Sequence, residues 1–71
     1  MPEPSQSVEF IPIREVVRMT SLSKPVVYRM ISRNEFPRQV TLSLRRVAWV
    51  RSDVERWQRQ RMEGGATREA A

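Results

Sequence analysis

Arginine supplies most of the chemistry available to this sequence. Lys24 is its single lysine, and every other cation is an arginine. The planar guanidinium group forms paired hydrogen bonds with phosphate groups and with the edge of guanine. Cysteine and histidine do not occur in the sequence, which excludes a disulfide and leaves carboxylates as the only strong metal ligands. We therefore expect a binding protein rather than an enzyme, with no metal or other cofactor.

The positive charge is concentrated in the middle of the chain. The 71 residues carry a formal net charge of +5, but residues 10–62 alone hold twelve cations and four acids. A polyanion such as nucleic acid is the partner that this excess favours. An acidic protein, a membrane surface or a merely soluble surface would give the same excess, so the placement of the cations must decide.

Two apolar stripes predict two short helices joined by a tight turn. The first helix should cover residues 12–19 and the second residues 23–33. Their apolar residues recur at the i, i+3 and i+4 spacing: Ile13, Val16 and Val17, then Val27, Met30 and Ile31. Such a pair is typical of a helix-turn-helix, although a helical hairpin in any small bundle has the same pattern.

Local signals set the ends of the second helix. Ser23 is suited to cap its N-terminus through the side-chain oxygen, and Pro25 falls in the first turn, where a missing N–H costs nothing. Asn34 can take the left-handed conformation that ends a helix. Phe36 and Pro37 follow, and the proline ring cannot continue the helix.

The face opposite the apolar stripe of the second helix carries cations and small apolar groups. We expect Arg29 to contact a base edge, guanine above all, unless it is solvated or paired with Glu35. Lys24 is expected at a phosphate or a base edge, and Arg33 at a phosphate or at the helix C-terminus. The other residues assigned to this surface are Ser23, Pro25 and Val26, the last two as thymine-methyl contacts, and Tyr28, whose ring should pack while its hydroxyl reaches a phosphate.

The hydrophobic pattern changes to a period of two in the second half of the chain. Two short strands joined by a turn at residues 43–45 are predicted by the alternation of Val40, Leu42, Val47 and Trp49 with polar residues. Because an isolated hairpin is marginal in water, Val47 and Trp49 should anchor it on the helices. Arg45 and Arg46 then lie at the tip, where they could reach the minor groove or backbone of DNA, or merely protect an edge strand from aggregation.

A third helix follows the predicted hairpin. Ser52 and Glu55 have the spacing of a capping box, so the helix should begin at Asp53, run to about Met62 and end at the glycines, residues 64–65.

The chain divides into one domain and two flanking segments. Residues 1–9 are expected to be a disordered arm, residues 10–62 the folded domain and residues 63–71 a flexible tail. The apolar pair at residues 10–11 should form a short entry strand that packs on the core.

This pattern resembles the AlpA-type regulators of phages and prophages, small relatives of the MerR-type helix-turn-helix and of phage excisionases. The resemblance covers residues 10–59 and rests on REVVRMTSLSKPVVYRMISRNEFPRQVTL followed by RRVAWVRSDVERW. It implies a mainly α winged helix-turn-helix with the order α-α-β-β-α, a recognition helix over residues 23–33 and a wing over residues 42–47. The chain departs from the family at Ser21, where the family carries glycine, and at residues 43–44, where it carries two glycines.

The expected function is sequence-specific binding of double-stranded DNA by a transcriptional regulator of a prophage or integrative element, in the cytoplasm on the nucleoid. An excisionase that bends DNA beside a phage-type integrase would use the same surface, and copies could associate on DNA. A third hypothesis is a protein-interaction module built on the third helix and Leu44. The N-terminus lacks the features of a signal peptide and no apolar run approaches membrane-spanning length, so no membrane partner is expected.

Overall fold

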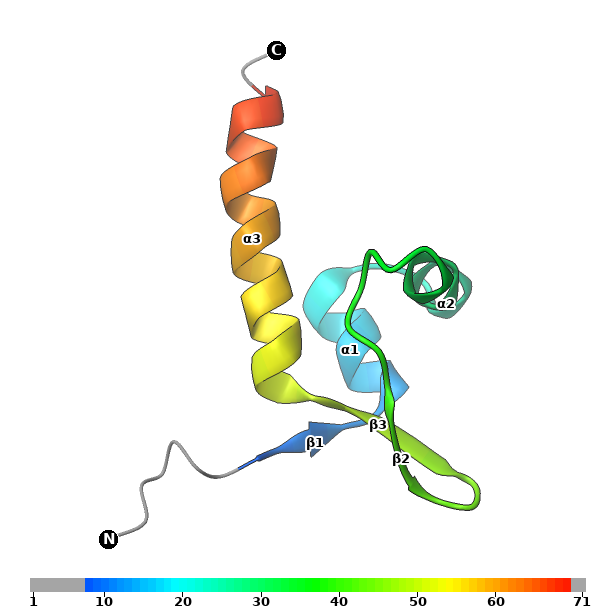
Figure 1. Ribbon diagram of the computed structural model, residues 1–71. Helices are drawn as coiled ribbons and strands as arrows, with labels where there is room; N and C mark the ends of the chain where they lie inside the picture. Colours follow the sequence, from blue (N-terminus) through cyan, green and yellow to red (C-terminus); the bar gives the residue numbers. More distant parts are fainter. Residues whose placement is uncertain (1–7, 70–71) are drawn as a thin grey trace, which may run out of the picture.

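Three helices and a small antiparallel sheet give the chain a winged helix-turn-helix arrangement (Figure 1). The computed structural model describes residues 8–69. Its elements are β1 (Phe10–Ile11), α1 (Ile13–Thr20), α2 (Lys24–Ser32), β2 (Val40–Ser43), β3 (Arg46–Val50) and α3 (Arg51–Glu69). The mainly α class with a small hairpin, expected from the sequence, is confirmed.

The sheet has the strand order β1-β3-β2, with both pairs antiparallel. β1 is the entry strand expected at residues 10–11, and it pairs Ile11 with Trp49 and Phe10 with Val50. Ile11 is buried and Phe10 is exposed, because successive side chains of a strand point to opposite faces. β2 and β3 form a hairpin, here called the wing, which projects on the side away from α3 (Figure 1).

One small core joins the helices to the base of the wing. Its buried residues are Ile11, Val16, Val27, Ile31, Phe36, Trp49 and Val54, which come from every element except β2 and from the α2–β2 loop. Trp49 is fully buried, as expected of a wing anchor. The expectation that Val47 is a second anchor is wrong, because its side chain is 42% exposed. Val47 pairs with the exposed Thr41 nearer the wing tip, and Ala48 is buried instead.

The turn between α1 and α2 is tight and held by hydrogen bonds. Ser21 ends α1 in the left-handed conformation, with φ of 64°, and its N–H donates to the carbonyl of Val17. The Thr20 hydroxyl donates to the Val16 carbonyl (2.8 Å) and accepts from the N–H of Leu22 (3.2 Å). A left-handed residue with a side chain costs about 1 kcal/mol relative to glycine, so the turn keeps the expected geometry with some strain.

α3 begins earlier and ends later than the sequence predicted. It starts at Arg51, directly after β3, and runs to Glu69, so Ser52 lies inside the first turn. The N–H of Arg51 donates to the carbonyl of Glu9 (2.8 Å), which satisfies an amide of the first turn without the expected capping box. Gly64 lies within the helix beside open space. A glycine in a helix costs only about 1 kcal/mol, so it weakens the helix without ending it.

Residues 63–69, expected in the tail, therefore continue α3. The expected arm at residues 1–9 and the last two residues of the tail fall largely outside the described residues, 8–69, and the domain limits stay a prediction. Within the described part of the chain, no helix combines the length and the apolar character needed to cross a membrane.

Candidate nucleic-acid interface

The outer face of α2 is a ridge of exposed side chains. Pro25 and Arg29 lie four residues apart, so their side chains line up along one side of the helix, and Arg33, the residue that caps its C-terminus, follows four residues after Arg29. All three are exposed, whereas Val27 and Ile31 on the opposite side are buried. The helix therefore presents a narrow basic surface to solvent while its other face is held in the core.

The start of α2 is capped as the sequence predicted. The Ser23 side-chain oxygen accepts a hydrogen bond from the N–H of Val26 (3.4 Å), and Pro25 lies in the first turn. Lys24, the first residue of the helix, is exposed and Val26 is half-buried. At the other end Asn34 takes the expected left-handed conformation, with φ of 60°. Both ends of the helix are thus set by residues next to the proposed contacts.

Tyr28 connects the outer helix to the base of the wing. Its ring meets that of Trp49 edge to face, with 5.9 Å between the ring centroids. The side chain is half-buried and packs against the core, which confirms the packing expected of it. Contact between its hydroxyl and a phosphate remains a prediction.

The second group of predicted residues lies at the tip of the wing. Leu44 and Arg45 form the turn, and Arg46 is the first residue of β3 and pairs with Ser43. Both arginines are exposed, and the Leu44 side chain is 95% exposed. In Figure 1 the wing tip and α2 lie on the same side of the molecule, away from α3.

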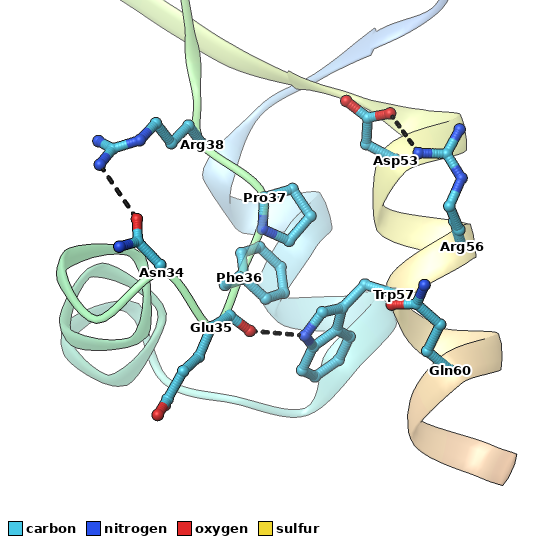
Figure 2. A pocket seen from close by; sticks show the side chains of 9 residues that line it. All are labelled: Asn34, Glu35, Phe36, Pro37, Arg38, Asp53, Arg56, Trp57 and Gln60. Atoms are coloured by element: carbon cyan, nitrogen blue, oxygen red, sulfur yellow. Dashed lines mark hydrogen bonds and ion pairs between the residues drawn. The ribbon is translucent and has the colours of Figure 1, made fainter. Parts of the chain in front are cut away.

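Both tryptophans fix the loop between α2 and the wing, and Figure 2 shows the contact made by Trp57. The indole N–H of Trp49 donates to the carbonyl of Pro37 (3.0 Å), and that of Trp57 donates to the carbonyl of Glu35 (2.9 Å). The Trp57 ring also packs edge to face on Phe36, with 4.8 Å between centroids. These contacts hold α2 and the wing in a set relative position. The sequence indicated that both tryptophans are structural, but not which carbonyls they bind.

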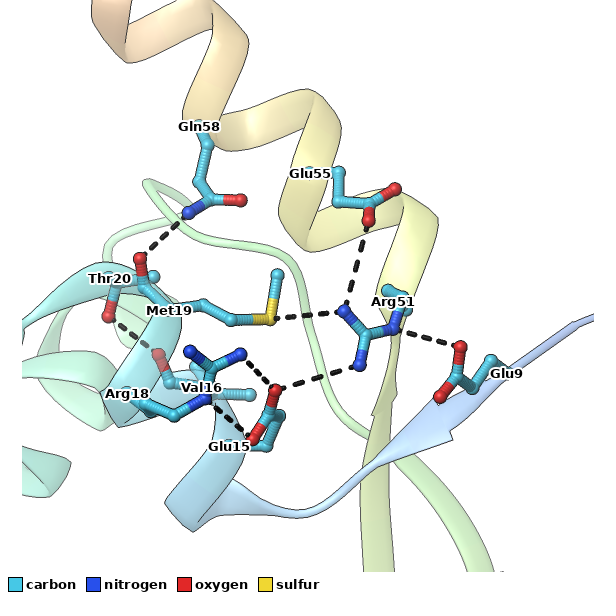
Figure 3. Close-up of polar contacts among 9 residues, drawn as sticks. All are labelled: Glu9, Glu15, Val16, Arg18, Met19, Thr20, Arg51, Glu55 and Gln58. Carbon is cyan, nitrogen blue, oxygen red and sulfur yellow. Dashed lines mark hydrogen bonds and ion pairs between the residues drawn. The ribbon is translucent and has the colours of Figure 1, made fainter.

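Arg18 of α1 and Arg51 at the start of α3 take part in ion pairs (Figure 3). Arg51 reaches three carboxylates: Glu9 at 2.9 Å, Glu15 at 3.6 Å and Glu55 at 3.9 Å. Arg18 donates to Glu15 through Nε at 3.0 Å. The hydrogen bond from Arg18, with the nearby charges of Arg18 and Arg51, lowers the pKa of Glu15. The positive charge on this side of the molecule is therefore largely neutralised within the fold.

By contrast, the cationic side chains among the predicted contact residues form no ion pair within the described part of the chain. Among residues 8–69, no ion pair involves Lys24, Arg29, Arg33, Arg45 or Arg46. The alternative pairing of Arg29 with Glu35 is thus not formed. Four other arginines also form no ion pair within this range: Arg14 of α1, Arg38 of the α2–β2 loop, which donates to Asn34, and Arg59 and Arg61 of α3, the latter over the Trp57 ring. The cations of α2 and the wing tip remain available for an external anion.

Within residues 8–69 there is no group of three or more acids, cysteines or histidines close enough to hold a metal ion. Figure 2 shows a shallow depression between the α2–β2 loop and α3, in which Asp53 and Arg56 pair with each other at 3.5 Å.

Two helices in a tight turn, an exposed basic ridge on the second and a hairpin beside it define a winged helix-turn-helix protein. The family model described as prophage CP4-57 regulatory protein (AlpA) matches residues 9–62, and the chain belongs to this family. It is also 38% identical over 65 residues to the uncharacterized protein ORF88 of Enterobacteria phage P4, an alignment that covers 90% of this chain and 74% of that protein. The resemblance drawn from the sequence is thereby confirmed, and the chain is a member of a prophage regulatory family.

Proposed function

We propose that this protein binds double-stranded DNA with sequence specificity and regulates transcription in a prophage or integrative element. The main support is that some cations are neutralised by ion pairs within the fold and others are not. Arg18 on α1 and Arg51 and Arg56 in the first turns of α3 are paired within the fold, whereas the cations on α2 and the wing tip have no ion pair with any residue in the range 8–69. Arginines without ion pairs can bind the phosphates of a polyanion, and an exposed helix can enter its groove.

In this proposal α2 enters the major groove, which is about 12 Å wide and admits a helix. Arg29 lies at the middle of the exposed ridge, so it is the residue placed to read a base edge, guanine above all. Lys24 and Arg33, at the two ends of the helix, hold phosphates on either side of it. The remaining contacts are made by Ser23, Pro25, Val26 and the Tyr28 hydroxyl along the helix and by Arg45 and Arg46 from the wing.

The rigid link between α2 and the wing supports simultaneous contact by both. The two indole N–H groups fix the loop backbone at Glu35 and Pro37. A pre-ordered pair of contact elements loses less conformational entropy on binding than a mobile pair. The wing would then lie on the backbone or the minor groove next to the major-groove site.

The test is selection of bound duplexes from a random pool, followed by footprinting on the enriched site. A sequence-specific regulator should enrich one site, and log affinity should fall with log salt by about 0.9 per neutralised phosphate. Arg56→Ala is the matched control, because Arg56 lies on α3 and already pairs with Asp53. A pool that remains unenriched after selection would contradict the proposal.

A second candidate function is an excisionase that bends DNA beside a phage-type integrase. The apolar side chain at the wing tip favours it, because apolar residues in the minor groove kink DNA. Such a protein should bind tandem sites, with copies in contact on DNA, and should retard fragments according to the position of the site. Straight complexes together with promoter control in cells would exclude it.

A further inference from the structure

Leu44 is the most exposed of the large apolar side chains in the described part of the chain, with 95% of its surface accessible. It occupies the apex of the wing and contributes nothing to the core. Its sequence neighbours on the C-terminal side, Arg45 and Arg46, are exposed and without ion pairs among residues 8–69. An apolar side chain followed directly by two cations without ion pairs fits a partner that has an apolar contact surface surrounded by negative charge.

The backbone of the wing is adapted to carry a side chain at this apex. In residues 8–69 the only non-glycine residues with positive φ are Ser21 and Asn34, so the turn at residues 44–45 is not one of the glycine-favouring turns usual in two-residue hairpins. Thr41 pairs with Val47 and Ser43 with Arg46, which leaves one extra residue on β2 between these pairs.

That extra residue is Leu42, and it makes the wing bulged. A bulge bends a hairpin and increases its twist, so it re-aims the residues beyond it. The bulge lies next to the turn at residues 44–45. The wing therefore presents Leu44 by a local change of backbone geometry, at a position that no helix covers.

We propose that Leu44 is an apolar wedge that enters the DNA minor groove and partly unstacks one base step, while Arg45 and Arg46 bind the flanking phosphates. A narrow minor groove has an enhanced negative potential that attracts arginine, and leucine is among the side chains that insert between base steps. This inference rests on the proposed function and deepens it, because it assigns the wing a role in deforming DNA. Flexible pyrimidine–purine steps are the preferred place for insertion.

The experiment uses the full chain and the duplex that it enriches from a random pool, with 2-aminopurine placed in turn at each step flanking the footprint of α2. Fluorescence of this base rises when it is unstacked. Wild-type protein should raise the fluorescence at one step, and Leu44→Ala should abolish the rise. The affinity of Leu44→Ala should fall by less than about ten-fold, because the variant also avoids the free energy of unstacking.

Two matched variants separate the wedge from other effects. Met62→Ala removes an apolar side chain that is 73% exposed on α3 and should leave the fluorescence rise intact. Arg45→Ala should retain most of the rise but reduce the salt slope by about 0.9, whereas Leu44→Ala should leave the slope unchanged. Since Leu44 lies outside the core, its replacement should not affect folding.

Each alternative gives a different result. Tight, site-specific binding without any fluorescence rise, or with a rise that survives Leu44→Ala, would overturn the wedge while the proposed function stands. Failure to enrich any duplex would overturn both. A wild-type dimer in sedimentation without DNA that Leu44→Ala converts to monomer, with DNA fluorescence unchanged, would assign Leu44 to contact with a second copy and the wedge would be wrong.

Discussion

The indole N–H of Trp49 donates to the backbone carbonyl of Pro37 over 3.0 Å. This bond joins the strand β3 of the wing to the loop that leaves α2, so one side chain connects both elements of the proposed interface. The same ring is fully buried and meets Tyr28 of α2 edge to face. The position of the wing relative to α2 is thus set from inside the core.

Replacing either tryptophan by phenylalanine should therefore destabilise the fold, and Trp49→Phe should do so more. Trp49 is fully buried, so its loss leaves a cavity and an unpaired carbonyl at Pro37, for which we expect about 2–4 kcal/mol. Trp57 is half-buried, and water can replace its bond to Glu35, so about 1 kcal/mol is expected. Urea unfolding of both variants measures the difference, and equal losses would contradict this account of the loop.

Ser21→Gly should stabilise the protein by about 1 kcal/mol. Ser21 has a φ of 64°, which glycine adopts without the steric cost that a side chain imposes. Ser21→Ala is the control, because alanine keeps the side-chain cost and should not stabilise. Thermal unfolding should show a higher midpoint for the glycine variant alone. A lower midpoint for the glycine variant would mean that serine stabilises the protein more, by restricting the unfolded chain, than it destabilises the protein through strain in the turn.

The features that the sequence predicted correctly are those set by neighbouring residues. The bounds of α1 and α2 follow from a repeated apolar stripe, and the cap at Ser23 lies three residues from its donor, Val26. The start of α3 was missed because its first amide binds the carbonyl of Glu9, which is distant in sequence. Val47 was misplaced because alternation gives the face of a residue but not how far the helices cover the strand.

The sequence predicted the candidate site about as well as it predicted the fold. Exposure of the α2 ridge follows from helical periodicity, since residues opposite a buried stripe face solvent. Which cations are neutralised depends on contacts between distant elements, such as the ion pair of Arg51 with Glu9, and no local pattern reports them. The same holds for the bonds from the tryptophans to the loop carbonyls.

The ion pairs of Glu15 make stability depend on pH in acid. The hydrogen bond from Arg18 lowers the pKa of Glu15 below its ordinary value of 4.5, so the unfolded chain takes up a proton before the folded one does as pH falls. The contribution of Glu15 is therefore complete above pH 4.5 and is lost as the pH drops through the lower folded pKa.

Comparison of wild type with Glu15→Gln checks this dependence. The urea midpoint of wild type should exceed that of the variant at pH 7, and the difference should shrink as the pH falls below 4.5, where the unfolded chain takes up a proton at Glu15. The effect should be small at high salt, because these groups are exposed. A difference that stays constant from pH 7 to pH 3 would show that the carboxylate charge is not its source.

Arg29→Ala and Arg33→Ala should weaken DNA binding in two different ways, although both side chains lie on the same exposed ridge of α2. Arg29, at mid-helix, is proposed to read a base, so its loss should cost about 1–3 kcal/mol and relax sequence preference at one base pair. Arg33, at the C-terminal end, is proposed to bind phosphate, so its loss should weaken all sequences alike and reduce the salt slope by about 0.9.

Binding measurements over a panel of single-base variants of the enriched duplex, at several salt concentrations, distinguish the two effects. Arg56→Ala serves as the control of equal charge change, since Arg56 pairs with Asp53 on α3 and should alter neither the preference nor the slope by more than the experimental scatter. If Arg33→Ala relaxes the preference and Arg29→Ala does not, then the C-terminal end of α2, and not its middle, faces the base pairs, and the helix lies in the groove at a different angle.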